Sequence, residues 1–226
     1  MDRNIPVITI DGPSGSGKGT LAQKLAIYLN WNYLDSGALY RILALVANKR
    51  EISLSDEEKL SSLIEELDIQ FFLSTLGLKI IWDKLDISQE IRSEGNAAIA
   101  SRLATLPVVR QSLLGKQRDF RKLPGLVTDG RDMGTIVFPD AVFKFFLTAS
   151  PKQRALRRYN QLKEKGISAN LTTIEKEVVE RDKRDCNRSV SPLRKAENAA
   201  IIDSTAMSID GVFQQVLLEV QKNLSS

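Results

Sequence analysis

The 226-residue chain contains no histidine, one cysteine and few aromatic residues. The missing histidine excludes Ser-His-Asp and Cys-His nucleophilic chemistry and histidine-ligated zinc. The single thiol, Cys186, excludes an internal disulfide and fits a reducing compartment, so we expect a cytoplasmic protein. Catalysis must then use Lys, Arg, Asp, Glu, the backbone and a hard metal ion. Phosphoryl transfer is the reaction class that needs nothing else, because it depends on positioning and on the neutralisation of charge.

Long apolar runs are also lacking. No stretch reaches 18 apolar residues, and residues 1–6 contain no apolar signal region, so we expect neither a membrane span nor a leader. The net charge of +4 suits a small anionic ligand and is too weak to indicate nucleic acid. The few aromatic residues are not interleaved with basic ones, which also argues against nucleic-acid binding. Nothing in the sequence requires a dimer, and we expect a monomer.

A glycine-rich loop lies between an apolar run, Val7–Ile10, and a helical pattern of leucine and alanine residues. Its members are Gly12, Pro13, Ser14, Gly15, Ser16, Gly17, Lys18, Gly19 and Thr20. This order of elements directs backbone N–H groups and a helix N-terminus at one spot, where a polyphosphate binds, and Lys18 adds positive charge. The standard loop carries Ser or Thr after its lysine as a magnesium ligand. Here Gly19 follows the lysine, so we assign no direct metal ligand and keep Thr20 as a candidate.

Five apolar runs predict the strands of a parallel sheet, because helical patterns follow most of them. They are Val7–Ile10, Trp31–Leu34, Leu126–Thr128, Val142–Leu147 and Ala199–Ile202. With 42% hydrophobic residues, the chain can bury the core of one α/β domain with insertions or of two small domains. Aspartates follow four of the runs, at the strand ends where ligands gather in such sheets.

An ordered excursion separates the second and third predicted strands. The alternating runs Ile69–Leu73 and Leu78–Trp82 predict a β-hairpin, and helical patterns flank it at 39–47 and 91–123. Ser55–Glu58 has the pattern of a capping box that opens a further helix. We interpret this excursion as an inserted substrate-binding subdomain.

Three more helices are predicted in the last third of the chain. Ser150 caps the first, which stops near Gly166. A capping box at Thr172–Glu175 opens the second, which runs toward Cys186, and Ser208 starts the third.

Two short constellations follow predicted strands. Ser36 and Arg41 lie at a helix start, which indicates either a second anion site or an ordinary capped helix. Asp129 and Asp132 flank Arg131, which can grip a phosphate while a carboxylate anchors a ligand or a metal-bound water. The alternative there is a turn with a local ion pair.

A third constellation is rich in arginine: Arg154, Arg157, Arg158, Arg181, Arg184, Arg188 and Arg194. Arg181, Asp185 and Arg188 have the spacing of one helix face. Arginines in a mobile lid stabilise charge in phosphoryl transfer. The alternative is a solvated helix face with weak ion pairs.

In this order, the motifs GPSGSGKGT, DSGALYR, DGRDMGT and ERDKRDCNRS resemble bacterial cytidylate kinases, a family of nucleoside monophosphate kinases. The loop alone indicates a P-loop phosphotransferase, whereas the full set resembles the family over essentially the whole chain. The resemblance implies an α/β fold with a five-stranded parallel sheet flanked by helices. It implies phosphorylation of CMP and dCMP with ATP and Mg²⁺. The expected organisation is a core (1–36, 124–153, 195–226), an acceptor-binding insertion (37–123) with a small sheet, and a helical lid (154–194).

The resemblance also implies roles for single residues. The Gly12–Thr20 loop would hold the ATP phosphates, and the catalytic residues would be Lys18, Arg131, Arg158 and Arg188. Ser36, Arg41 and Arg131 would grip the acceptor phosphate. The cytosine would be read by Ser101, Arg110 and Asp132. Tyr40 would shape the acceptor pocket, Asp185 beside Arg181 would meet the ribose, and Arg158 and Arg188 would belong to the lid.

Two other functions stay open at this point. The chain has the features of an enzyme that phosphorylates another small acceptor, such as a different nucleotide or a metabolite hydroxyl. It is less suited to a GTPase switch, because its only candidate for the guanine-reading Asn-Lys-x-Asp motif, Asn48–Glu51, ends in Glu and lies in a helical pattern.

Overall fold

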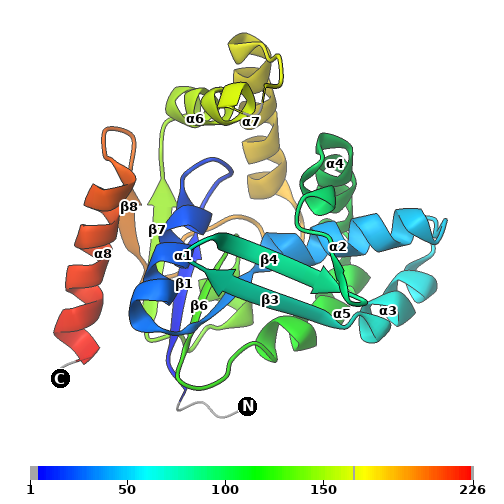
Figure 1. Ribbon diagram of the computed structural model, residues 1–226, viewed down its shortest axis with the longest axis horizontal. Helices are drawn as coiled ribbons and strands as arrows, with labels where there is room; N and C mark the ends of the chain where they lie inside the picture. Colours follow the sequence, from blue (N-terminus) through cyan, green and yellow to red (C-terminus); the bar gives the residue numbers. More distant parts are fainter. Residues whose placement is uncertain (1–4, 165, 225–226) are drawn as a thin grey trace.

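The computed structural model describes residues 5–164 and 166–224 (Figure 1). The remaining positions of the predicted core and lid, 1–4, 165 and 225–226, lie outside the described residues. A five-stranded parallel sheet has the order β2-β6-β1-β7-β8. Its strands are β1 (Val7–Asp11), β2 (Asn32–Asp35), β6 (Leu126–Gly130), β7 (Phe143–Thr148) and β8 (Ala200–Asp203). All five predicted strands are confirmed, with shifts of one or two residues at their ends.

The central strands β1 and β6 are buried at every residue, which explains their nearly continuous apolar sequence. Helix α1 (Lys18–Leu29) buries Leu21, Ala22, Leu25 and Ala26 in the core, and α8 (Ile209–Leu224) packs beside it. Because β6 pairs with β1 on one side and β2 on the other, the carboxyl ends of these three strands adjoin. In this register Asp35 lies opposite Asp129, at the edge where the glycine-rich loop begins.

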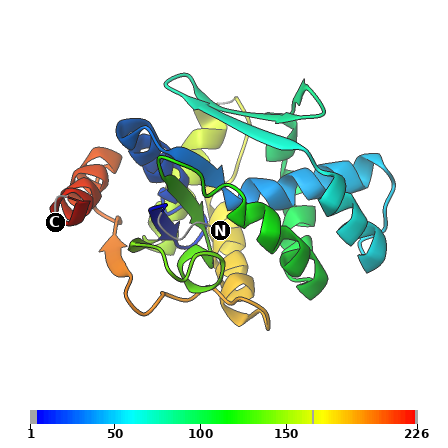
Figure 2. The same cartoon turned by 90° about the horizontal axis from the view of Figure 1, so that it is seen from below.

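The segment between β2 and β6 folds into helices and a second sheet. The helices are α2 (Ser36–Lys49), α3 (Glu57–Glu66), η1 (Glu90–Arg92), α4 (Glu94–Leu103) and α5 (Pro107–Arg118). The sheet has the antiparallel order β3 (Ile69–Ser74), β4 (Gly77–Trp82), β5 (Leu85–Asp86), and Figure 2 shows it to one side of these helices. The predicted hairpin is confirmed, whereas β5 was not predicted. Its turn uses Asp83 and Lys84 with φ of 48° and 63°, so the glycine that usually marks such a turn is missing.

Two predicted capping boxes are wrong. The side chain of Asp56, rather than Ser55, caps α3 by accepting a hydrogen bond from the backbone three residues on. Helix α7 (Leu171–Asn187) begins earlier than expected, with Asn170 rather than Thr172 as its cap. Asp56 is the residue after Ser55, and Asn170 lies two positions before Thr172. Asp and Asn are favoured cap residues, so each competes with the neighbouring Ser or Thr for the same helix start.

Helices α6 (Pro151–Glu164) and α7 pack against each other and stand above the carboxyl ends of the strands (Figure 1). The predicted cap of α6 is confirmed, since Ser150 accepts a hydrogen bond from the backbone of Gln153. The two helices share a small apolar cluster around Ala155, Ile174 and Val178, separate from the main core. Within residues 5–164 and 166–224, no helix combines the length and the apolar content that a bilayer crossing requires.

Gly12 has a φ of 151°, and a Cβ at this position would lie 2.0 Å from the carbonyl oxygen of Leu147. We expect Gly12→Ala to lower the free energy of unfolding by about 1–3 kcal/mol or more, because a backbone atom must move. Gly115→Ala is the matched control, since a Cβ in the middle of α5 meets open space. It should raise stability by about 1 kcal/mol through helix propensity. Urea unfolding measures both, and equal stabilities for the two variants would contradict the prediction.

Candidate active site

Two cavities adjoin at the carboxyl ends of β1, β2 and β6. The first, of about 250 Å³, is enclosed by residues of α2, α4, the turn after β6, and α7. The second, of about 760 Å³, lies between the glycine-rich loop, α6 and the start of α8. Ser14, Lys18 and Gly19 line both cavities. A ligand in one cavity therefore lies next to a ligand in the other, with Lys18 between them.

The glycine-rich loop has the shape of an anion cradle. Gly15 and Gly17 adopt φ of 77° and 96°, and Gly17 begins α1 with no side-chain cap in the described part of the chain. The N–H groups of the first turn of α1 are thus available to a ligand. Ser16 adds a buried hydroxyl with no hydrogen-bond partner among residues 5–164 and 166–224. Ser14–Thr20 line the second cavity, while Gly12 and Pro13 are buried.

Side chains from outside this loop donate hydrogen bonds to two of its carbonyl groups. Arg154 Nη1 donates to the carbonyl of Ser14 at 3.1 Å, and Arg157 Nη1 donates to that of Ser16 at 3.0 Å. The hydroxyl of Ser204, at the end of β8, also donates to Ser16 at 3.1 Å. The sequence grouped the two arginines with the lid and gave Ser204 no role.

A carboxylate network lies beside Lys18. Tyr33 donates its hydroxyl hydrogen to Asp129 Oδ1 at 2.8 Å. Burial, reinforced by the neighbouring carboxylate of Asp35, raises the pKa of Asp129 to about 7. Burial and the repulsion of Arg131 lower the pKa of Lys18 to about 7. The sequence did not reveal Tyr33, whose hydroxyl reaches the site from a position that reads as an ordinary strand residue.

Cations crowd one end of the first cavity. Arg131 Nε donates to Asp185 Oδ2 at 2.7 Å, and both side chains are mostly buried. Burial and repulsion by Arg131 lower the pKa of Arg181 to about 10, and Arg41 and Arg158 add to this effect. The Arg181 Nε is buried with no hydrogen-bond partner in the described ranges. Guanidinium groups that repel one another around one space create a site for an anion.

The start of α2 is capped by Asp35, and its role as an anion site stays a prediction. Asp35 accepts a hydrogen bond from the backbone N–H of Ala38 at 3.0 Å, so this N–H is not available to a ligand. Ser36 lines the first cavity, and its hydroxyl donates to the carbonyl of Asp129 at 2.8 Å.

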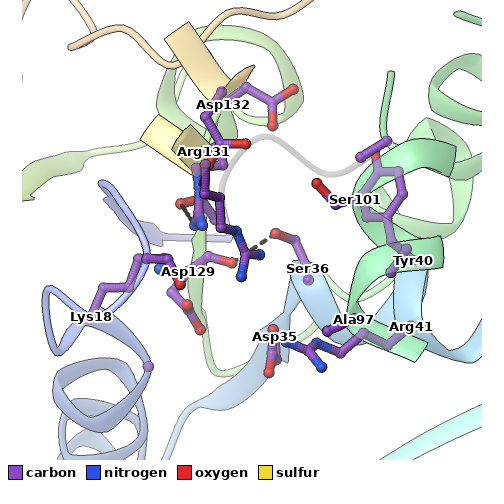
Figure 3. Close-up of a pocket in the computed structure, with 18 of the residues that line it drawn as sticks. Lys18, Asp35, Ser36, Tyr40, Arg41, Ala97, Ser101, Asp129, Arg131 and Asp132 are labelled. Carbon is purple, nitrogen blue, oxygen red and sulfur yellow. Dashed lines mark hydrogen bonds and ion pairs between the residues drawn. The ribbon is translucent and has the colours of Figure 1, made fainter. Parts of the chain in front are cut away.

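The opposite end of the first cavity contains polar groups that can read a planar ring. Arg110 pairs with Asp132, donates to the carbonyl of Ala104 at 3.1 Å, and lies with Cζ 5.7 Å from the ring centroid of Tyr40. Arg110 Nε is buried without a partner in the described part of the protein. Burial raises the pKa of Tyr40 to about 12, which keeps its hydroxyl neutral. Figure 3 shows Ser101 and Tyr40 across the cavity from Lys18, with Arg131 and Ser36 between them.

The turn after β6 positions Arg131 and Asp132. Its next residues, η2 (Met133–Val137), form one π-helical turn. The buried Asp11 carboxylate accepts hydrogen bonds from the backbone of Met133 at 2.9 Å and of Gly134 at 2.8 Å. Asp11 therefore fixes the two functional residues through the backbone that follows them.

The structure brings the predicted acceptor residues into the first cavity: Ser36, Tyr40, Arg41, Ser101, Arg110, Arg131, Asp132, Arg181, Asp185 and Arg188. Arg158 lines the second cavity instead. Arg188 does not continue the helix face of Arg181 and Asp185, because α7 ends at Asn187 and Arg188 has extended backbone angles. Nucleotide contacts of these residues stay predictions.

Some lining residues were not predicted. Ala97 and Ala100 of α4 and Ala104, its C-terminal cap residue, line the first cavity. They are spaced three and four residues apart, which places small side chains in a row on one helix face. This pattern could have been recognised in the sequence.

Comparisons with known proteins show which family the chain resembles. A family model described as cytidylate kinase matches residues 8–222. A cytidylate kinase of Nitrosococcus oceani is 56% identical over 219 residues, which is 96% of each chain. A cytidylate kinase of Methylococcus capsulatus is 53% identical over 223 residues, 99% of this chain and 100% of its own. Among solved structures, an uncharacterized protein from Eubacterium ventriosum matches with a TM-score of 0.53 and 14% identity, over 96% of this chain and 98% of its own. That likeness concerns the fold alone.

Burial raises the pKa of Asp11 to about 6, against the combined effect of its two backbone hydrogen bonds. Asp132 raises this pKa further, and Arg131 lowers it. Between about pH 4 and pH 6 the folded protein thus binds more protons than the unfolded chain. Its free energy of unfolding should fall as the pH rises through this window, by roughly 3 kcal/mol from this group.

Asp11→Asn removes this titration, so the stability difference between parent and variant should change from pH 4 to pH 6 and stay flat above pH 7. Urea unfolding across pH 4–8 measures the difference. Parallel curves for the two proteins are the contrary result.

Proposed function

This chain belongs to the cytidylate kinase family, and we propose that its adjoining cavities transfer the γ-phosphoryl group of ATP to CMP or dCMP. The products are ADP and CDP or dCDP. The observation that carries this proposal is that Ser14, Lys18 and Gly19 belong to both cavities. A phosphate held by the loop then lies beside a phosphate in the first cavity, as direct transfer requires.

The donor takes the second cavity. The uncapped start of α1, the buried hydroxyl of Ser16 and the ammonium of Lys18 are suited to the ATP phosphates. The negative charge of these phosphates also offsets the repulsion of Lys18 by its cationic neighbours and favours the charged form of Lys18. The nucleoside would lie along α6 and the start of α8, where Arg158 lines the wall.

The acceptor takes the first cavity, with its phosphate among Ser36, Arg41 and Arg131. An oxygen of that phosphate attacks the γ-phosphorus, and the bond to the bridging β-phosphate oxygen breaks. No general base is required, because the acceptor phosphate is already ionised. Lys18, Arg131, Arg158 and Arg188 are the groups we assign to neutralising the transferred charge. Asp185, with Arg181 beside it, would meet the ribose.

The base end favours cytosine. Cytosine presents an N4 donor beside the N3 and O2 acceptors. Asp132 can accept from N4 and Arg110 can donate to N3 or O2, while Ser101 lies on the same wall. Uracil would place an acceptor against the buried carboxylate and leave it unsatisfied, at a cost of roughly 1–3 kcal/mol. UMP should therefore be the poorer substrate.

The oxygen groups near Lys18 fit a magnesium ion bound with ATP. Asp35 and Asp129 line the first cavity and Thr20 lines the second, and Mg²⁺ prefers oxygen ligands and retains several waters. Within residues 5–164 and 166–224, no three His, Cys, Asp or Glu side chains are grouped so that they could hold a metal ion. We assign coordination of the ion jointly to the groups above and to the substrate phosphates. When bound, the ion would neutralise charge on those phosphates.

The division into core, acceptor-binding insertion and lid is part of the same proposal, since residues of all three line the cavities. Closure of α6 and α7 would exclude water and so suppress ATP hydrolysis. The monomeric state and the cytoplasmic location stay predictions.

The decisive experiment is product formation from ATP with CMP, dCMP, UMP, AMP and GMP under identical conditions. We expect CMP and dCMP to react and UMP to react less well. A preference for AMP, GMP or a metabolite hydroxyl would overturn the assignment. Binding of ATP against GTP separates the kinase from a GTPase switch, and tighter binding of GTP would contradict our proposal.

Lys18→Ala should lower turnover by about 10²–10³, since it removes a charge aimed at the transferred group. Lys24→Ala is a control on the same helix, where the ammonium pairs with Asp210 at the surface. Steady-state kinetics with CMP measures both variants. Near-normal turnover of Lys18→Ala would refute its assigned role.

Asp132→Asn should lower the CMP-over-UMP ratio of kcat/KM by about tenfold or more, because an amide can donate to uracil as well as accept from cytosine. Asp132→Ala should also reduce this ratio, with an added stability loss of about 3–5 kcal/mol because Arg110 stays buried without its partner. Kinetics with both nucleotides, with thermal unfolding as a check, tests this. An unchanged ratio in the folded variants argues against Asp132 as the base reader.

A further inference from the structure

Arg154, in the first turn of α6, connects three parts of the protein at once. Its side chain is 3% exposed. Nε donates to the carbonyl of Ala149 at 2.9 Å, and Nη1 donates to the carbonyl of Ser14 at 3.1 Å. Nη1 also donates to Asp182 Oδ1 at 2.9 Å, and Nη2 pairs with the other oxygen of the same carboxylate. One guanidinium thus holds the end of β7, the glycine-rich loop and α7.

The glycine-rich loop rests directly on Arg154. A Cβ at Gly15 would lie 3.1 Å from Arg154 Cβ and 3.3 Å from its carbonyl oxygen. The loop therefore contacts the backbone of α6 at Arg154. The side chain of this same residue also binds the carbonyl of Ser14. A phosphate that shifts or fixes this loop acts on Arg154 through both contacts.

On its other side, Arg154 sets the position of α7. Asp182 turns toward Arg154, while its neighbour Arg181 lines the acceptor cavity. One turn further on, Asp185 pairs with Arg131 in that cavity. The same helix thus carries the contact with α6 and residues that line the first cavity.

Helices α6 and α7 share a small apolar cluster. Its buried members are Ala155, Ile174 and Val178, and the partly buried Tyr159, Leu162, Ala169 and Leu171 pack against them. The two-pronged ion pair of Arg154 with Asp182 adds a polar constraint on how the two helices meet, since loss of Asp182 leaves the buried guanidinium of Arg154 without its charged partner.

We propose that Arg154 is a positioning residue that energetically couples donor binding at the glycine-rich loop to acceptor binding beside α7. The inference rests on the proposed function, because it takes ATP as the donor and CMP as the acceptor. Such coupling is reciprocal: each nucleotide strengthens binding of the other by the same factor. Arg154 lines the donor cavity, and we assign its effect to its contacts with Ser14 on one side and Asp182 on the other.

Calorimetric titration of CMP, with and without saturating β,γ-methylene-ATP, tests this coupling. In the parent protein we expect the analogue to lower the Kd of CMP by at least about fivefold. In Asp182→Asn this ratio should fall toward one, because the α7 contact loses its charge. Arg154→Lys should behave alike, since an ammonium lacks the planar fork that serves both partners. Glu180→Gln makes the same charge change at an exposed position of α7 and should retain the parent ratio.

A purely structural weakening would raise both Kd values of CMP equally and leave their ratio unchanged. Asp182 is 24% exposed, so we expect Asp182→Asn to fold. If Arg154→Lys does not fold, the Kd ratio of Asp182→Asn alone tests the coupling. Thermal unfolding shows whether each variant folds. A folded Asp182→Asn protein that keeps the parent ratio overturns the inference, as does a parent protein without coupling. Failure of the parent protein to bind CMP in either titration would instead overturn the proposed function.

Discussion

Mutual repulsion among buried cations is the constraint on which this structure depends. Lys18, Arg131 and Arg181 come from three different segments, and burial together with their neighbours' charge lowers the pKa of Lys18 and Arg181. A fold does not concentrate such charges without a reason, because each one costs solvation. Under the proposed function, the phosphate groups of the two nucleotides relieve this cost, since they supply negative charge to these cations. The same repulsion would favour a polyphosphate and a monophosphate held side by side.

Carboxylates keep this arrangement ordered. Asp185 holds Arg131, and Asp132 holds Arg110, so the guanidinium groups facing the acceptor have fixed positions. Asp11 holds the backbone that follows Arg131 and Asp132. Each of these carboxylates accepts charged or backbone donors in a buried setting, where such hydrogen bonds orient a side chain strongly. The sheet topology is what makes the arrangement possible, because it gathers the ends of β1, β2 and β6 at one edge.

The sequence predicted the strands and the glycine-rich loop of this site better than the helix caps and the long-range side-chain contacts that hold them. Strand ends and the glycine-rich loop were readable because apolar runs, glycines and aspartates mark them locally. The caps at Asp56 and Asn170 were missed because a Ser/Thr-x-x-Glu pattern competes with each of them. One pattern begins one residue before Asp56, and the other begins two residues after Asn170. Tyr33 and Arg154 were missed as contributors for a different reason. Their partners, Asp129 and Asp182, lie 96 and 28 residues away, and local periodicity carries no information about such pairs.

The anchoring of the loop carbonyls has a consequence for the thermodynamics of nucleotide binding. Arg154, Arg157 and Ser204 hold the carbonyl side of the loop before any ligand arrives. Little conformational entropy is then lost when the phosphates dock, since the backbone is already preorganised. Under the proposed function, the triphosphate would then supply most of the affinity for ATP, and the base would contribute less. Specificity for the nucleobase would be concentrated on the acceptor, where the ion pairs Arg110–Asp132 and Arg131–Asp185 fix the geometry.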